Sequence, residues 1–262
     1  MAMQAALGQR GGSPRPRAPL PPPSPMRPQT PHGPPPTTPH TSAPPKTAAQ
    51  LPKVAGATFV ELGADKWVDA HNRYRKQAAT TAQTGASGAA NMQRMVWSET
   101  IAEKARAWAG RCEYAHQFQD REVAGFGATG ENIYHSSFQP SIQSVVSMWH
   151  SEVSRYNYPT RSCQPGKACG HYTQIVWATS CAVGCAVVKC DAMTMMDYSK
   201  NVKKLPNHYF TVCKYGPPGN VIEFGSKPQK TKAIYIDGKA CSACKSGCEA
   251  DGIFCKPDAR CA

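Results

Sequence analysis

The chain has 262 residues, a formal net charge of +13 at pH 7 and 12 cysteines, all of which follow residue 111. It contains no run of ~20 apolar residues, so we expect no transmembrane helix. It also lacks zinc-finger spacing, a ribonucleoprotein strand motif and a basic region with heptads, which argues against a nucleic-acid-binding protein. An even number of cysteines at this density predicts disulfide bonds and an oxidising, extracellular location.

The N-terminal 50 residues differ in composition from the rest of the chain. Residues 1–50 contain 15 of the 24 prolines and five basic residues, but no acidic residue, aromatic residue or cysteine. Such a segment buries too little apolar surface to offset the entropy of ordering it, so we expect disorder with polyproline character. Its first residues, MAMQAALGQRGG, lack the apolar stretch of a signal peptide, and none is recognisable. The remaining residues keep a charge of +8, which suits a sulfated glycan or an anionic lipid.

Three segments have the apolar spacing of amphipathic helices. They are residues 58–76, 98–111 and 141–155. Ser98 and Ser141 stand where the second and third helices would begin, and serine is a favoured N-cap residue.

Three later segments are rich in valine, alanine and aromatic residues and predict strands. They are residues 171–177, 182–189 and 208–214. In the first of them, His171 would share one face with Ile175 because alternate residues of a strand point the same way. Helices followed by closely spaced strands predict an α+β fold, with an antiparallel sheet covered by helices.

Two histidines and two glutamates stand in four separate motifs. They are His116 in CEYAHQ, Glu131 in GENIY, Glu152 in VVSMWHSEV and His171 in GHYTQIVW. Cys112 and His116 are four residues apart and would share one face of a helix. Two imidazoles and two carboxylates are a reasonable ligand set for one divalent cation, usually zinc or magnesium. On spacing alone, separate hydrogen-bonded side chains are the simpler interpretation.

Four ordered motifs resemble the CAP superfamily, which includes cysteine-rich secretory proteins, wasp-venom antigen 5 and plant pathogenesis-related proteins. GHYTQIVWATS at 170–180 and FTVCKYGPPGN at 210–220 are similar to the two signature stretches of the family. HNRYR at 71–75 and GENI at 130–133 are similar to two further motifs. The resemblance spans residues 60–222.

The resemblance implies an α-β-α sandwich with a central antiparallel sheet and helices on both faces. It divides the chain into four parts. They are a disordered, proline-rich basic segment at 1–55, a CAP domain at 56–222, a linker at 223–237 and a small disulfide-rich, hinge-like segment at 238–262.

The resemblance also implies a metal-binding cleft. The family's cleft tetrad falls on His116, Glu131, Glu152 and His171, and zinc is the expected ion. Three neighbours are expected to line the cleft: Asn132, Tyr172 and Gln174. Because a metal binds neutral imidazole, acid pH should release it. Lys214 departs from the second signature, which usually has Asn, Gln, His, Arg or Ser there. On a strand edge, this departure is expected to have little effect.

The plant-type cysteine pattern of the family implies three disulfides: Cys112–Cys190, Cys163–Cys169 and Cys185–Cys213. The remaining cysteines are Cys181, Cys241, Cys244, Cys248, Cys255 and Cys261. The five tail cysteines cannot all pair among themselves, so Cys181 bonds to one of them or stays free. We expect the bond, which would hold the tail against the sheet near residue 181.

The sequence favours binding over catalysis, since it lacks an H-E-x-x-H motif and no cysteine is expected to be free. The resemblance implies sterol or fatty-acid binding in some members and receptor or channel modulation in venom members. We therefore expect a secreted binding protein that acts in extracellular defence or signalling. Its partner would be a sterol, a fatty acid, a cell-surface receptor or a sulfated glycan. A metal-dependent protease and a venom-type modulator are the alternatives. YNYPTRSC at 156–163 is either a mobile lipid-binding flap or a plain surface loop.

Overall fold

In the computed structural model, the described residues are 51, 53–196, 201–225 and 230–261. They belong to one compact unit. The predicted disorder of residues 1–50 therefore falls outside the described residues. No helix among the described residues is long and apolar enough to cross a membrane.

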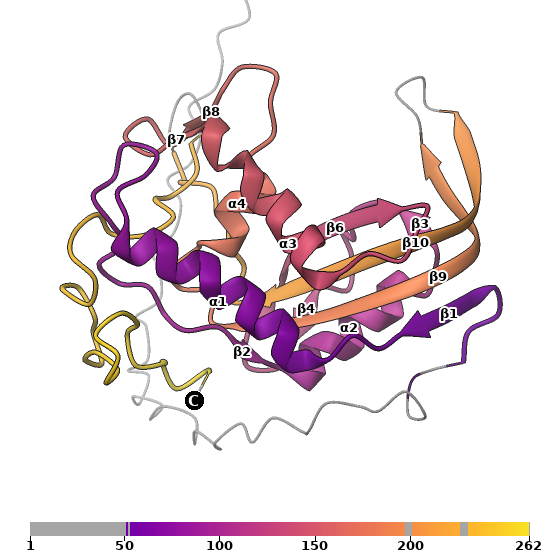
Figure 1. The fold of residues 1–262 in the computed structure, drawn as a ribbon, viewed down its shortest axis with the longest axis horizontal. Coiled ribbons are helices and arrows are strands. Elements are labelled where there is room, and N and C mark those ends of the chain that lie inside the picture. The colour runs from indigo at the N-terminus through magenta and orange to yellow at the C-terminus, as the bar shows by residue number, and fades with distance from the viewer. Residues whose placement is uncertain (1–50, 52, 197–200, 226–229, 262) are drawn as a thin grey trace, which may run out of the picture. The chain divides into compact units, whose positions relative to one another are not determined.

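A central antiparallel sheet organises the domain (Figure 1). Its strands run in the order β1, β9, β10 and β6, and they span Ala57–Val60, Ala182–Met196, Val202–Gly216 and Gly130–Ser136. Two short strands, β2 at Val96–Trp97 and β3 at Glu113–Tyr114, pair with β9 in parallel. Two small hairpins complete the strands: β4 with β5 (Glu122–Val123, Gly127–Ala128) and β7 with β8 (Tyr156–Asn157, Ser162–Cys163).

Helices cover both faces of this sheet. The helices are α1 (Ala64–Thr80), α2 (Glu99–Ala109), α3 (Ile142–His150) and α4 (Gly170–Ile175). Side chains of β9 alternate between two apolar cores on opposite faces of the sheet. In the first core, Cys185 and Val187 pack with residues of α1, α3 and α4. In the second, Ala186 and Val188 pack with residues of α2. A strand segment buried on both faces is expected to be apolar, and the buried first half of β9, residues 182–188, is. The expected α+β sandwich with a central antiparallel sheet is confirmed.

The approach of α2 to the sheet depends on Gly184 in β9. A Cβ atom at this position would lie 2.1 Å from the backbone nitrogen of Ala102 in α2. No side chain fits at that distance, so the glycine allows helix and strand to pack backbone to backbone.

The predicted helices form, with different ends. Residues 58–76 comprise strand β1, a bend and the start of α1, because the first residues pair with β9 and the helix begins only after Gly63. The segment 98–111 forms α2, capped by Ser98 as predicted. The segment 141–155 is α3 followed by a 3₁₀ turn at Ser151–Arg155.

One predicted strand is wrong. Residues 171–177 begin in the short helix α4 instead, so His171, Ile175 and Trp177 do not share a strand face. The other two predicted strands are confirmed and extend into β9 and β10. Strand β6 escaped prediction because GENIYHS is rich in polar residues, and its strand conformation comes from pairing with β10.

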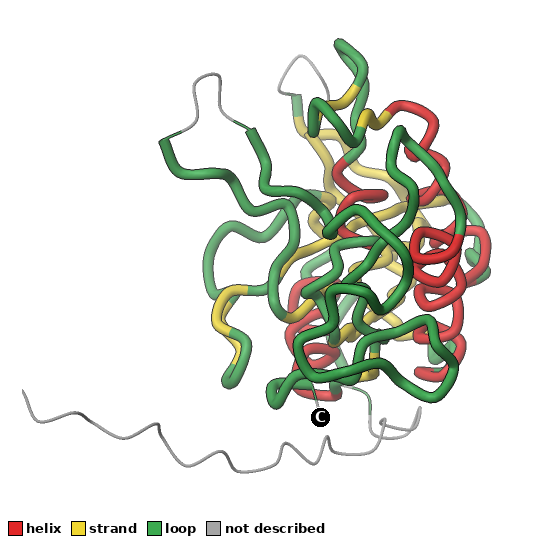
Figure 2. Tube along the Cα trace, turned by 90° about the vertical axis from the view of Figure 1, so that its left-hand side faces the viewer, coloured by secondary structure: helices red, strands yellow, loops and turns green. Residues whose placement is uncertain are grey.

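The C-terminal residues dock on the domain. Ile234 and Tyr235, in the predicted linker, are buried in the main core together with Phe254 of the tail. Arg94 pairs with Glu249 at 2.7 Å and its guanidinium lies 4.4 Å from the ring of Phe254. Seen from the side of the tail, residues 230–261 run as loop without helix or strand (Figure 2). The tail thus contacts the domain through an ion pair and through apolar packing.

The six disulfides account for all 12 cysteines. The three bonds implied by the resemblance are formed: Cys112–Cys190, Cys163–Cys169 and Cys185–Cys213. Two bonds lie within the tail: Cys241–Cys248 and Cys244–Cys255. The sixth joins Cys181 to Cys261, as we expected for one tail cysteine.

Candidate metal centre

Glu152 and His171 form the first pair of the tetrad. Oε1 of Glu152 accepts a hydrogen bond from His171 Nδ1 at 2.8 Å. Oε2 accepts from the backbone amides of His171 and Tyr172 at 3.0 and 3.2 Å, so the carboxylate caps the first turn of α4. Burial alone raises the pKa of Glu152, but the hydrogen bonds from His171 and the two amides outweigh it and lower the pKa.

The helix α4 explains why an imidazole stands at residue 171. Tyr172 and Ile175 of α4 are buried in the core, while the His171 side chain is 29% exposed. At the other end, the guanidinium of Arg75 donates to the carbonyls of Ile175 and Trp177, both at 2.8 Å. His171 thus lies on the first turn of a short helix fixed at both ends.

Glu131 and His116 form the second pair. Glu131 lies near the start of β6, and its Oε1 accepts from His116 Nδ1 at 2.8 Å and from the amide of Gln117 at 3.1 Å. His116 follows β3 in a loop, with its side chain 48% exposed. The predicted helical face shared by Cys112 and His116 is wrong, because α2 ends at Ala109 and Cys112 has a φ of 55°.

Lys214 is part of this second pair. Its side chain is 0% exposed, and its Nζ donates to Oε2 of Glu131 at 2.8 Å. Strand β10 lies between β9 and β6, so the expected edge position of Lys214 is wrong. Burial raises the pKa of Glu131, but His116 and Lys214 together outweigh burial and lower it.

The three side chains expected to line the cleft are buried: Asn132, Tyr172 and Gln174. Asn132 donates from Nδ2 to the His171 carbonyl at 3.1 Å and to the Tyr215 hydroxyl at 3.2 Å. Gln174 accepts from the amide of Gly219 at 3.0 Å. A Cβ at Gly130 would lie 2.1 Å from Gln174 Oε1, so glycine is required there. These residues support the backbone beneath the tetrad.

The donor chemistry of the two pairs fits a divalent ion. Each carboxylate engages Nδ1 of its histidine, which leaves Nε2 of His116 and of His171 as the free ring nitrogen. A carboxylate on the remote nitrogen is the usual support of a metal-binding imidazole, because it fixes the ring and raises its basicity. Glu131 and Glu152 therefore orient the histidines, and the two Nε2 atoms are the atoms that could coordinate a metal ion.

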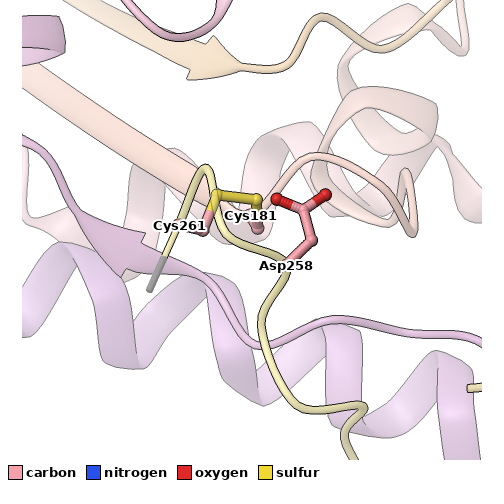
Figure 3. Close-up of side chains that lie close together, drawn as sticks. All are labelled: Cys181, Asp258 and Cys261. Atoms are coloured by element: carbon pink, nitrogen blue, oxygen red, sulfur yellow. A yellow bond between two sulfur atoms is a disulfide. The ribbon is translucent and has the colours of Figure 1, made fainter. Parts of the chain in front are cut away.

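The tetrad is not a compact four-donor cage. Among the described residues, one group of three or more His, Cys, Asp or Glu has its ligand atoms all within 4.8 Å of one another: Cys181, Asp258 and Cys261 (Figure 3). Two of these atoms are the bonded sulfurs of a disulfide, so the group offers no thiolate to a metal.

Comparison with known proteins decides the family. The model of the Cysteine-rich secretory protein family, CAP, matches residues 68–215, which is more than half of the chain. This chain belongs to the CAP family. CAP proteins with many disulfides are typically secreted, and the six disulfides found here suit an oxidising compartment.

Its curated relatives are longer CAP proteins. Glioma pathogenesis-related protein 1 of Mus musculus is 34% identical over 201 residues, which is 76% of this chain and 64% of the relative. Peptidase inhibitor 16 of Homo sapiens is 34% identical over 191 residues, which is 72% of this chain and 35% of the relative. The chain thus spans less than two thirds of each.

Solved structures share the CAP fold. The crystal structure of NaASP2 with Zn²⁺ has a TM-score of 0.56 at 24% identity, covering 79% of this chain and 100% of that chain. The structure of Na-ASP-1 has a TM-score of 0.57 at 26% identity, covering 80% of this chain and 51% of the other.

Proposed function

We propose that this chain is a secreted binding protein, not an enzyme, whose two His–Glu pairs hold a divalent cation, with zinc as the first candidate. The observation that carries the proposal is the matched geometry of the pairs. In each, a largely buried carboxylate lies 2.8 Å from Nδ1 of a partly exposed histidine. The packing of an apolar core does not require such pairs. A metal-binding histidine does require a partner on its second ring nitrogen, because this partner orients the ring.

The residues divide into ligands and supports. His116 and His171 would bind the ion through Nε2, while Glu131 and Glu152 keep the rings in the tautomer that leaves this nitrogen free. The bound ion would offer its remaining coordination positions to an oxygen or nitrogen donor of a partner molecule. A protein of the same fold was crystallised with Zn²⁺, which supports the choice of ion.

The side chains near the tetrad argue against an enzyme. All cysteines are in disulfides, so none is a nucleophile. The hydroxyl of Ser151, next to Glu152, donates to the Met148 carbonyl at 2.7 Å, and no basic side chain among the described residues accepts its proton. Two relatives are named peptidase inhibitors, which also disfavours the metal-dependent protease.

For the ligand we propose a sterol or other lipid, which the family resemblance implies, in a role in extracellular defence or signalling. In the segment 156–163, the Tyr158 hydroxyl donates to the Tyr235 carbonyl at 2.7 Å and the two rings stack, which favours the plain surface loop over the mobile flap. A cavity of about 130 Å³ lies beside α1, lined by Asp69, Ala70, Arg73, Tyr74 and Gln143. Since drug-sized ligands occupy roughly 300 Å³ or more, this cavity must open to admit a lipid.

Calorimetric titration with zinc at pH 7.5 tests the cation site. We expect binding by the parent chain and none by H116A/H171A, while H208A, which removes a histidine outside the tetrad, should bind like the parent. Binding should weaken at pH 5, because protonated imidazole is not a ligand. Equal affinity of H116A/H171A and the parent would refute the cation site. Mass spectrometry of a lipid extract of the purified protein tests the ligand, and its absence would favour a receptor or a sulfated glycan.

A further inference from the structure

The two His–Glu pairs differ in net charge once their neighbours are included. With neutral imidazoles, the pair of Glu152 and His171 carries one negative charge. Among the described residues, Glu152 accepts hydrogen bonds from His171 and from two backbone amides, and from no lysine or arginine. The pair of Glu131 and His116 also carries one negative charge, but the ammonium of Lys214 lies 2.8 Å from Glu131, so the three side chains together are neutral.

The neutralising charge is built into the sheet. Lys214 lies directly opposite Glu131 in the register of β10 and β6. Its Nζ has no other hydrogen-bond partner among the described residues, and its side chain is fully buried. Arg121 and Lys104 are close enough to add positive potential at Lys214, and Lys104 is itself paired with Asp120 at 2.7 Å.

Such a charge acts on a neighbouring cation. Electrostatic interactions are stronger at buried sites than in water, so the ammonium repels a divalent ion that approaches His116. The same hydrogen bond draws electron density from Glu131, which weakens the support that this carboxylate gives to the imidazole. Both effects lower cation affinity on the His116 side and leave the Glu152–His171 pair unaffected.

We propose that Lys214 sets the cation affinity of the cleft: its buried ammonium cancels the charge of Glu131, so the ion binds weakly and mainly through His171. This inference rests on the proposed function, because it concerns the same cleft. The CAP resemblance does not supply it, since Lys214 is a departure from the family signature.

A purely structural role for Lys214 predicts a different pattern. If the side chain serves only to satisfy Glu131, any replacement that keeps a hydrogen-bond donor should leave zinc affinity unchanged. Glutamine keeps a donor and removes the charge, and asparagine offers a second neutral amide that the family signature accommodates. Arginine keeps the charge and is the matched control.

The experiment measures zinc affinity of the full chain by competition with a chromogenic chelator for the parent, K214Q, K214N and K214R. Thermal unfolding without metal shows which variants are folded. We expect K214Q or K214N to bind zinc about tenfold more tightly than the parent, the lower end of the usual effect of residues that support metal ligands. K214R should stay within about twofold of the parent because its charge is unchanged.

The outcomes separate the two proposals. If the parent binds zinc and the folded neutral variants bind no more tightly than K214R, the role of Lys214 is refuted and the cation site stands. If only the neutral variants bind, the role of Lys214 is supported and the parent's cation site is refuted. If no variant binds zinc, both proposals fail.

Discussion

Replacing Arg75 with methionine should lower the free energy of unfolding of the domain more than replacing an exposed residue of α1. The guanidinium is completely buried and makes five hydrogen bonds to backbone carbonyls. Two go to Gln93, at 3.0 and 2.6 Å. The others go to Ile175, Trp177 and Ala178, at 2.8, 2.8 and 3.2 Å. Burial lowers the pKa of Arg75 to about 9, so the group is charged at pH 7.

The size of the effect follows from these contacts. The carbonyls of Trp177 and Ala178 also accept from the amides of Ser180 and Gln93, at 3.1 and 3.2 Å. R75M would therefore leave two carbonyls, those of Gln93 and Ile175, without a donor among the described residues, and at about 1–3 kcal/mol for each buried unsatisfied group the cost is about 2–6 kcal/mol. Removing the buried charge returns part of this cost as desolvation energy. We therefore expect R75M to lose about 2 kcal/mol of unfolding free energy, against the ~5–15 kcal/mol of an ordinary domain.

Urea unfolding followed by tryptophan fluorescence measures this loss. R73M is the matched control, because Arg73 lies on the same helix and is exposed. R75K should fall between R75M and the parent, since an ammonium has three donors and lacks the planar fork. If R75M unfolds within about 1 kcal/mol of the parent, water or a rearranged backbone satisfies the carbonyls and the reasoning is wrong.

Two further predictions concern acid stability and the tail. Burial lowers the pKa of His71 to about 4, so the unfolded chain takes up this proton first as pH falls. The parent should then lose about 3 kcal/mol of stability between pH 6.5 and 4, and H71Q should lose correspondingly less in urea titrations across that range. Separately, proteolysis between residues 222 and 240 should leave the tail attached through Cys181–Cys261 until reductant is added. A tail peptide that separates under non-reducing conditions would contradict the assigned bond.

Periodic segments could be predicted from the sequence because their own residues determine them. The apolar spacing in 98–111 and 141–155 reports a face that packs on the sheet, and serine caps mark both starts. Residues 171–177 failed because β-branched and aromatic residues favour a strand locally. Their helical state depends on Glu152 and Arg75, which lie 19 and 100 residues away from the groups that they bind. The local propensity of residues 171–177 gives no information about partners so far away in the sequence.

The tetrad shows a similar limit. Its four members follow from the family motifs, but their roles do not, since a sequence does not say which nitrogen a carboxylate will meet. In the structure, Glu131 and Glu152 contact Nδ1 of the two histidines, which leaves Nε2 of each as the ligand that we propose. The sequence predicts a strand edge for Lys214, and only the position of β10 inside the sheet reveals that this residue neutralises Glu131.

These contacts explain why the HNRYR motif and the tetrad occur in one fold although Arg75 is not part of the tetrad. Glu152 holds the first turn of α4 through two amides, and Arg75 holds its last carbonyls. Asn132 also fixes the His171 carbonyl, and it is joined through the Tyr215 hydroxyl to His71 of the same motif. The imidazole of His171 is therefore positioned by α1 and β6 together, so that the buried polar residues of the core serve the geometry of the site.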